Sequence, residues 1–265
     1  MNTAHLGSLV TLFTLLASAP AGGQDMLRGI DLTSPAMTQA ELTREDVMER
    51  LAGATPEKPA DFSGMRLSAL DLSGVDFKGA VFRAARLNKA TLSGTDLTGC
   101  ILDQAWLLEA DLTGAKLSGA SLFQAQLIGA TLDHADLSGA RVPSDLSRAS
   151  LKGAKLVGAS LGADMRNQSM GLTRGVFRKA NLEGADLSNA DLSRVDFEFA
   201  SLRGANLSGA NLTFANLGGA DLTGAKVSGA NFEQADLHSA RLESLIGADQ
   251  TNLDRAKNLS SALRN

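Results

Sequence analysis

The chain has 265 residues and a formal net charge of −4, too small a charge to indicate a particular class of partner. It contains no Tyr, one Trp and one Cys, which excludes an intramolecular disulfide framework and a multi-cysteine metal site. An ordinary domain of this length fills a thick core with aromatic side chains, so this composition predicts a thin core of Leu and Ala.

The N-terminus, residues 1–21, is expected to be a signal peptide. Residues 6–16 form an apolar run of the right length, too short to span a bilayer. Small residues follow, and we expect cleavage after Ala21, with Ala19 as the alternative site. No Lys or Arg precedes the run, which leaves a disordered apolar N-terminus as the other interpretation. The prediction is an exported, periplasmic protein without a transmembrane segment in the mature chain; a cytoplasmic location is the alternative.

The segment 22–59 should contain one short helix. Thr43 is suited to the N-cap position, and Asp46 lies three residues later, where a side chain can bond back to the cap. Val47, Met48 and Leu51 would form one apolar face. The sequence therefore predicts a helix from about residue 43 to residue 53.

A five-residue repeat runs from residue 60 to residue 245. One pentad reads Ala110-Asp111-Leu112-Thr113-Gly114. The central residue is Leu, Phe or Val in all 36 regular pentads, and the residue two before it is Ala in 27 of them. Neither a helical period nor a strand period keeps such a pattern in register. A large and a small apolar residue per pentad can fill a narrow tube, and Gly in the last slot suits a turn.

This pattern resembles the pentapeptide-repeat family. The resemblance implies an all-β fold, a right-handed quadrilateral parallel β-helix in which four pentads form one coil. The repeat would make roughly nine coils, with the short N-terminal helix as a cap over the open end. Residues twenty apart would stack in columns, for example Asp71 above Thr91.

The period fails after Leu242. Four apolar residues then follow at helical spacing: Leu253, Ala256, Leu259 and Leu263. Residues 246–265 are therefore expected to form a C-terminal cap or a homodimer contact.

No catalytic constellation, cofactor site or metal site is predicted. His134 and His238 fall at outward positions and are expected to be solvated. Cys100 replaces an inward Ala and is expected to be a buried, unreactive thiol. Most Asp residues occupy the slot before a central residue, so they belong to the repeat. The chain is expected not to be an enzyme.

Departures from the repeat are the candidates for function. One is a group of apolar residues at outward positions on two adjoining sides: Val81, Ile101, Trp106, Leu108, Phe123 and Ile128. Contiguous exposed apolar surface usually marks an interface, which makes these residues a predicted partner-binding patch. The alternative is that the N-terminal segment folds back over them. Phe199 and Phe214 form a second outward pair, either local filler or contact points.

The other departure is a register break with a basic surround. The spacing is four residues from Val142 to Leu146 and eleven from Leu161 to Leu172, which predicts a bulge or small loop. Basic residues cluster there: Arg141, Arg148, Lys152, Arg166, Arg174, Arg178 and Lys179. They are interpreted either as a solvated band or as a contact for an anionic partner.

Three functions follow from the sequence. The first is an exported scaffold that binds a protein or envelope component of unknown identity. The second, implied by the family resemblance, is a DNA mimic that modulates a type II topoisomerase. Residues 61–242 hold 19 acidic against 18 basic residues, which disfavours a polyanion mimic, and nucleic acid is an unlikely partner. The third is a structural rod that associates with itself.

Overall fold

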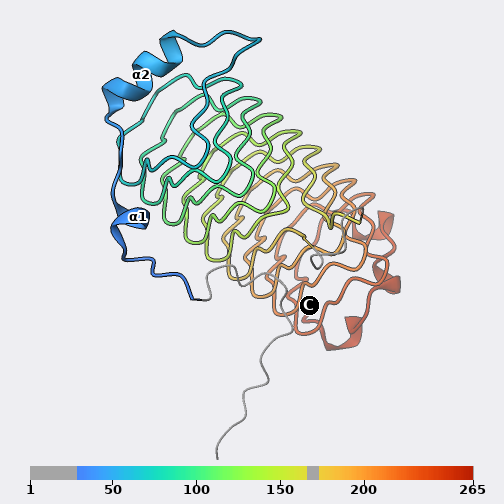
Figure 1. Cartoon of the computed structure of the whole chain (residues 1–265). Helices are drawn as coiled ribbons and strands as arrows, with labels where there is room; N and C mark the ends of the chain where they lie inside the picture. Colours follow the sequence, from blue (N-terminus) through green and yellow to red (C-terminus); the bar gives the residue numbers. More distant parts are fainter. Residues whose placement is uncertain (1–28, 166–172, 265) are drawn as a thin grey trace, which may run out of the picture.

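The main body of the protein is an elongated solenoid (Figure 1). The computed structural model describes residues 29–165 and 173–264, so the expected signal peptide, Arg166 and Leu172 lie outside the described residues. Parallel bridges join residues twenty apart, as from Asp71 to Thr91 and from Thr91 to Asp111. Four pentads therefore complete one coil, which confirms the predicted columns. Among the described residues, no helix is both long and apolar enough to cross a membrane.

Each pentad forms one side of a coil and turns a corner at its last residue. In the pentad of Leu112, that side chain is fully buried, and Asp111 Oδ1 accepts a hydrogen bond from the Thr113 amide at 2.9 Å. Gly114 follows with φ at 65°, a conformation that costs Gly little. The Asp before the central residue therefore stabilises the turn of its own pentad, as Asx turns do.

The core is a single column of apolar side chains inside the coils. Every described central residue from Phe62 to Leu242 is buried, and so are the Ala residues two positions earlier, which confirms the inward positions. Phe62 stacks on Phe82, one coil away, with ring centroids 5.0 Å apart. The large and small side chains alternate within each coil and so fill the narrow tube.

Two helices precede the solenoid, α1 (Pro35–Thr38) and α2 (Arg44–Ala52). A capping box begins α2, in which Thr43 accepts from the Asp46 amide and Asp46 accepts from the Thr43 amide. The helix lies across the end of the solenoid nearest the N-terminus (Figure 1). There Arg44 donates to the carbonyl oxygen of Asp71 at 2.8 Å, and Val47 is fully buried. Helix α2 is the helix that the sequence predicts.

The register break has two parts. Loss of one residue shortens the bridge spacing to nineteen, as from Gln126 to Asp145. The spacing then lengthens to thirty-one between Asp145 and Val176, because the chain leaves the coil after Leu161. The Asp164 amide donates to the Thr173 carbonyl oxygen at 2.9 Å, which closes the base of this excursion. The break is thus an insertion between two successive sides of one coil.

The C-terminal segment, which the sequence predicts as a cap or a homodimer contact, follows the last regular coil. It forms three short 3₁₀ turns, η2 (Ala248–Gln250), η3 (Leu253–Arg255) and η4 (Leu259–Ser261). Between them the chain still pairs with the preceding coil, through bridges from Asp236 to Lys257 and from Arg241 to Leu263. The helical spacing of the apolar residues arises because Leu253, Ala256 and Leu259 pack against the last coil.

Candidate partner-binding surface

The side chains that could carry chemistry lie apart from one another. Within the two described ranges, no group of three or more His, Cys, Asp or Glu side chains could hold a metal ion. Cys100 is fully buried and its thiol donates to the carbonyl oxygen of Phe77 at 3.2 Å. Burial raises the pKa of this thiol to about 12, which leaves it protonated at neutral pH and a poor nucleophile. His134 and His238 are exposed on different sides of the solenoid.

The apolar patch predicted from sequence is less exposed than expected. The structure places its six residues on two adjoining sides, and every one of them is half-buried. These side chains are therefore only partly accessible, and their role as a partner-binding patch stays a prediction. Intramolecular contacts lie beside two of these residues, Leu108 and Phe123.

The first contact comes from residues 29–42, which we call the N-terminal strap. Met37 on α1 is buried, and its carbonyl oxygen accepts from the Asn88 side-chain amide at 3.0 Å. The Asn88 side-chain oxygen in turn accepts from the Leu108 amide at 3.1 Å. Further along the strap, the Glu41 amide donates to the Arg66 carbonyl oxygen, and the Arg66 amide donates to the Glu41 carboxylate. The strap thus lies against the side that carries Leu108, in accordance with the interpretation that the N-terminal segment folds back.

The second contact covers Phe123. The Arg141 guanidinium carbon lies 3.9 Å from the centroid of its ring, a close cation–π contact. Arg141 also pairs with Asp164 at 2.9 Å. In the sequence, Phe123 belongs to the apolar patch and Arg141 to the basic band, and the stacking of the coils brings the two side chains together.

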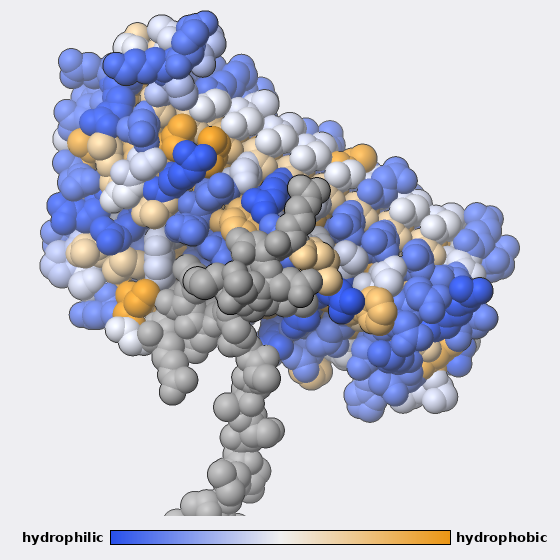
Figure 2. All heavy atoms as spheres, turned by 45° about the vertical axis from the view of Figure 1, so that its right-hand side comes forward, coloured by the Kyte–Doolittle hydropathy of each residue, from blue (hydrophilic) through white to orange (hydrophobic). Residues whose placement is uncertain are grey.

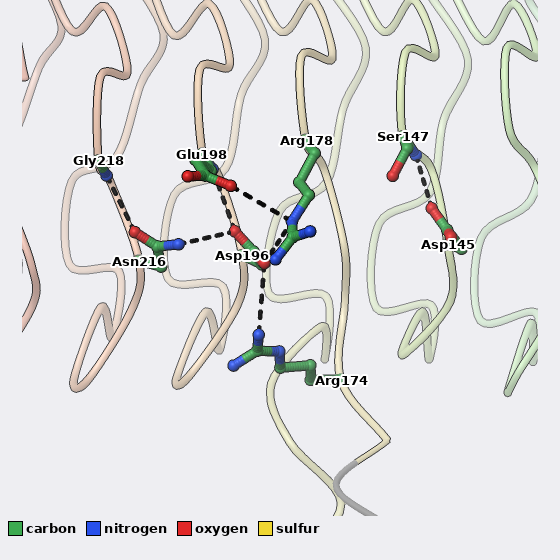
Figure 3. A network of polar contacts seen from close by, with 8 residues as sticks. All are labelled: Asp145, Ser147, Arg174, Arg178, Asp196, Glu198, Asn216 and Gly218. Carbon is green, nitrogen blue, oxygen red and sulfur yellow. Dashed lines mark hydrogen bonds and ion pairs between the residues drawn. The ribbon is translucent and has the colours of Figure 1, made fainter. Parts of the chain in front are cut away.

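Part of the predicted basic band is paired with acids, and Figure 3 shows the pairs of Arg174 and Arg178. Asp196, whose side chain is 1% exposed, accepts from Arg178 at 2.8 Å and from Arg174 at 3.3 Å. Arg178 also lies 3.6 Å from Glu198. Sequence reasoning missed these pairs because both acids lie one coil later in the chain.

The rest of the band does not form one continuous surface. Arg148, Lys152 and Lys179 are exposed, whereas Arg141, Arg174 and Arg178 are engaged with carboxylates. Arg166 lies outside the described residues. Opposite charges in neighbouring coils therefore neutralise half of the described basic side chains that the sequence grouped together.

The most exposed aromatic side chains among the described residues lie at two successive corners of the solenoid near its C-terminal end. Phe199 is 59% exposed and Phe214 is 43% exposed, each at the corner slot of its pentad with φ near +58°. The Phe199 ring lies directly over Gly219, where an added Cβ would come within 2.5 Å of two ring carbons. Phe214 stands at the corner before the side that contains Gly218 and Gly219, and Gly218 adds no side chain to that side. We call these four residues the aromatic face.

Cations surround Phe214. The Arg194 guanidinium carbon lies 4.4 Å from its ring centroid, and the Lys257 ammonium lies 5.8 Å from it. One sequence signal could have identified this surface. Phe214 is an aromatic residue at the last position of a pentad, where Gly is common, and two consecutive glycines, Gly218 and Gly219, end the next pentad.

The family model for pentapeptide repeats matches residues 60–99, 105–142, 176–213 and 215–245, in eight copies. The unmatched stretch 143–175 contains the insertion. No match is found among the curated proteins.

Several solved structures are similar to this chain. HetL, a pentapeptide repeat protein involved in heterocyst differentiation regulation in the cyanobacterium Nostoc sp. strain PCC 7120, is 29% identical, with 84% of this chain and 94% of that chain covered and a TM-score of 0.37. Trypsin-treated QnrB1, a plasmid-mediated fluoroquinolone resistance protein, is 19% identical, with 77% and 89% covered and a TM-score of 0.53. At that identity, the likeness to QnrB1 shows the fold alone.

Eight repeat matches cover more than half of the chain, and the coil of four pentads is the arrangement found in such proteins. The chain belongs to the pentapeptide-repeat family, and its solenoid is a right-handed quadrilateral β-helix.

Proposed function

We propose that this protein is a non-catalytic scaffold that binds a protein partner through the aromatic face. The observation that carries the proposal is the exposure of Phe199 and Phe214. A corner slot accepts Gly or a polar residue without loss of the coil, so the fold itself does not require an aromatic ring there. Exposed aromatic side chains that the fold does not require are typical of binding sites.

The remaining surface supports a localised contact. On the face drawn in Figure 2, most residues are hydrophilic, and apolar residues form small separate patches. Such a surface favours binding through a few anchoring side chains over burial of a broad apolar face. In this proposal the rod has about nine coils, with α2 as the cover of its N-terminal end.

Export is part of the proposal. The support is the apolar run at residues 6–16 followed by small residues. Osmotic-shock fractionation tests it: a chain that begins at residue 22 and appears in the periplasmic fraction is expected. An uncleaved cytoplasmic product would exclude export and leave the scaffold function to be tested in the cytoplasm.

The binding function is tested by covalent capture. Purified full chain that carries a cross-linker is incubated with extract from the native host, and Phe199→Asn together with Phe214→Asn should abolish the cross-linked product. Asn tolerates the left-handed corner conformation, so the coil should be preserved. The matched control is His134→Asn, at an exposed corner slot with a φ of 59°, which should leave capture unchanged. Capture that persists in the double variant would exclude the aromatic face as the binding site.

A second candidate is a self-associating rod. Ile246 and Leu263 are 53% and 50% exposed at the C-terminal end of the described solenoid. Sedimentation across a concentration series tests it, with Ile246→Ser and Leu263→Ser as the variants that should reduce association.

Modulation of a topoisomerase has less support. The likeness to QnrB1 shows only the fold, and surface columns mix the signs of charge, as in Asp136, Lys155 and Asp186. A polyanion mimic needs a dominantly acidic surface. Inhibition of DNA supercoiling by the purified chain would restore this function as the leading candidate.

A further inference from the structure

Building on the proposed function, we propose that the aromatic face binds an extended protein segment in which an acidic residue adjoins an apolar side chain. Three properties of the described residues carry this inference: the charge around the face, its shape and the position of its apolar anchors.

Two basic side chains that form no ion pair among the described residues lie beside Phe214. Arg194 and Lys257 both lie over its ring, and within the described chain neither forms an ion pair with a carboxylate. Cations held over an aromatic ring keep their charge and remain able to pair with an anion. A carboxylate placed beside Phe214 would therefore meet two unmatched cations.

Three of the neighbouring acids are occupied by arginines. Asp196 binds two arginines, and Glu198 lies beside Arg178. Glu233 pairs with Arg255 at 3.2 Å. These carboxylates do not neutralise the cations at Phe214, so the electrostatic complement of the face is acidic.

Asp236 also lies beside the aromatic face, and it forms no ion pair with a described basic side chain. It adjoins Lys257 in the column, and its Oδ1 accepts from the His238 amide at 3.0 Å and from the Asn258 side-chain amide at 2.7 Å. Because Asp236 would repel a second carboxylate, the acidic residue of the ligand is expected at the corner of Phe214, where the two cations lie.

The strip between the two rings carries little side-chain relief. Gly218 has no side chain, and the Asn216 side chain is held by two hydrogen bonds, to Asp196 at 3.0 Å and from the Gly218 amide at 3.1 Å. At one end the Phe199 ring covers Gly219, and at the other stands Phe214. Such a strip between two rings suits an extended segment, whose alternate side chains can contact the rings and the cations.

An anionic membrane fits the same surface less well. A lipid headgroup layer would approach Glu198 and Asp236 together with the cations, because all lie on one side of the solenoid. Like charges brought together in this way oppose binding. A short segment can place its carboxylate at Phe214 alone.

The test uses the full chain and fluorescein-labelled peptides read by fluorescence polarisation. The first peptide carries Phe and Leu flanked by Asp and Glu. In the second peptide, Asn and Gln replace the acids, and in the third, Ser replaces Phe and Leu. The first should bind at least about tenfold more tightly than either of the others, and its affinity should fall with added salt.

Variants locate the binding. Phe214→Asn, and separately Arg194→Gln with Lys257→Gln, should each weaken binding of the first peptide by about tenfold. His134→Asn should not change it, and unaltered circular dichroism should show that each variant remains folded. Equal binding of the first and second peptides would overturn the inference, and so would binding to phosphatidylglycerol vesicles with no binding to the first peptide.

The two proposals fail differently. If capture of a partner requires Phe199 and Phe214 but peptides bind regardless of charge, the scaffold function stands and the acidic specificity is wrong. If capture does not require the two rings, the proposed function fails whatever the peptides show.

Discussion

Arg178 Nε lies 2.8 Å from Asp196 Oδ2, on the coil that follows it in the solenoid. Arg174, at the end of the insertion, shares the same carboxylate oxygen. Asp196 therefore ties the point where the chain re-enters the coil to the next regular coil (Figure 3). The insertion is anchored by a nearly buried charge and not only by its own backbone.

Asp196→Asn should lower the free energy of unfolding by about 1–3 kcal/mol, because Asn keeps the turn but leaves two guanidinium groups without their carboxylate. Both arginines are partly exposed, so water can compensate for some of the loss. Urea unfolding measures the effect. The control is Asp145→Asn on the preceding coil, where the carboxylate bonds to the Ser147 amide of its own turn. Equal losses in the two variants would show that the ion pairs contribute nothing.

Cys100 should make the protein less stable at high pH. Its pKa is raised from 9.0 to about 12 by burial, so the folded state holds the proton more tightly than the unfolded state. The stabilisation is complete below pH 9 and is lost as the pH rises from there towards 12, at about 1 kcal/mol per pH unit. Cys100→Ala installs the commonest residue of that slot and should remove this dependence. A variant with the same alkaline slope in thermal unfolding would contradict the assignment.

Asn88→Ala should release the N-terminal strap. The change removes the bond to the Met37 carbonyl oxygen and the acceptor for the Leu108 amide. We expect faster hydrogen exchange at residues 35–41, a red shift in the emission of Trp106 and a stability loss of about 1–3 kcal/mol. Ser93→Ala, on another side, is the control. Unchanged exchange at residues 35–41 would show that other contacts hold the strap.

Gly219→Ala should affect binding more than its counterpart Gly224→Ala. Both glycines have positive φ, at 65° and 70°, so each change should cost about 1 kcal/mol in backbone strain. Only at Gly219 would the new Cβ meet the Phe199 ring; at Gly224 the space is open. The measurements are urea unfolding and polarisation with the acidic peptide. Equal binding by both variants would show that the Phe199 ring position does not matter.

Much of the fold could be predicted from single pentads. Leu112 and Ala110 are inward because each side of the coil needs one large and one small apolar residue, and that requirement recurs locally. The helix at residues 44–52 could also be predicted, because the two residues of its capping box are close in sequence. The 3₁₀ turns of the C-terminal segment could not be predicted in this way, because Leu253 and Leu259 are spaced by contacts with the preceding coil.

The candidate surfaces were harder to predict for the same reason. Whether Phe123 is covered depends on Arg141, and whether Arg178 is free depends on Asp196. Each of these pairs is eighteen residues apart and meets only when the coils stack. Trp106 and Leu108 were placed on the correct side, but the strap that lies against that side comes from residues far earlier in the chain.

By itself the sequence determined the repeat, the core and the family, because a five-residue period with inward Leu and Ala satisfies burial in every pentad independently. The tertiary structure decided which outward side chains are available to a partner. Exposure and charge depend on neighbours one coil away and on the strap, so they are fixed only when the coils stack. That is why the rings of Phe199 and Phe214, and not the side chains around Trp106, form the surface proposed for binding.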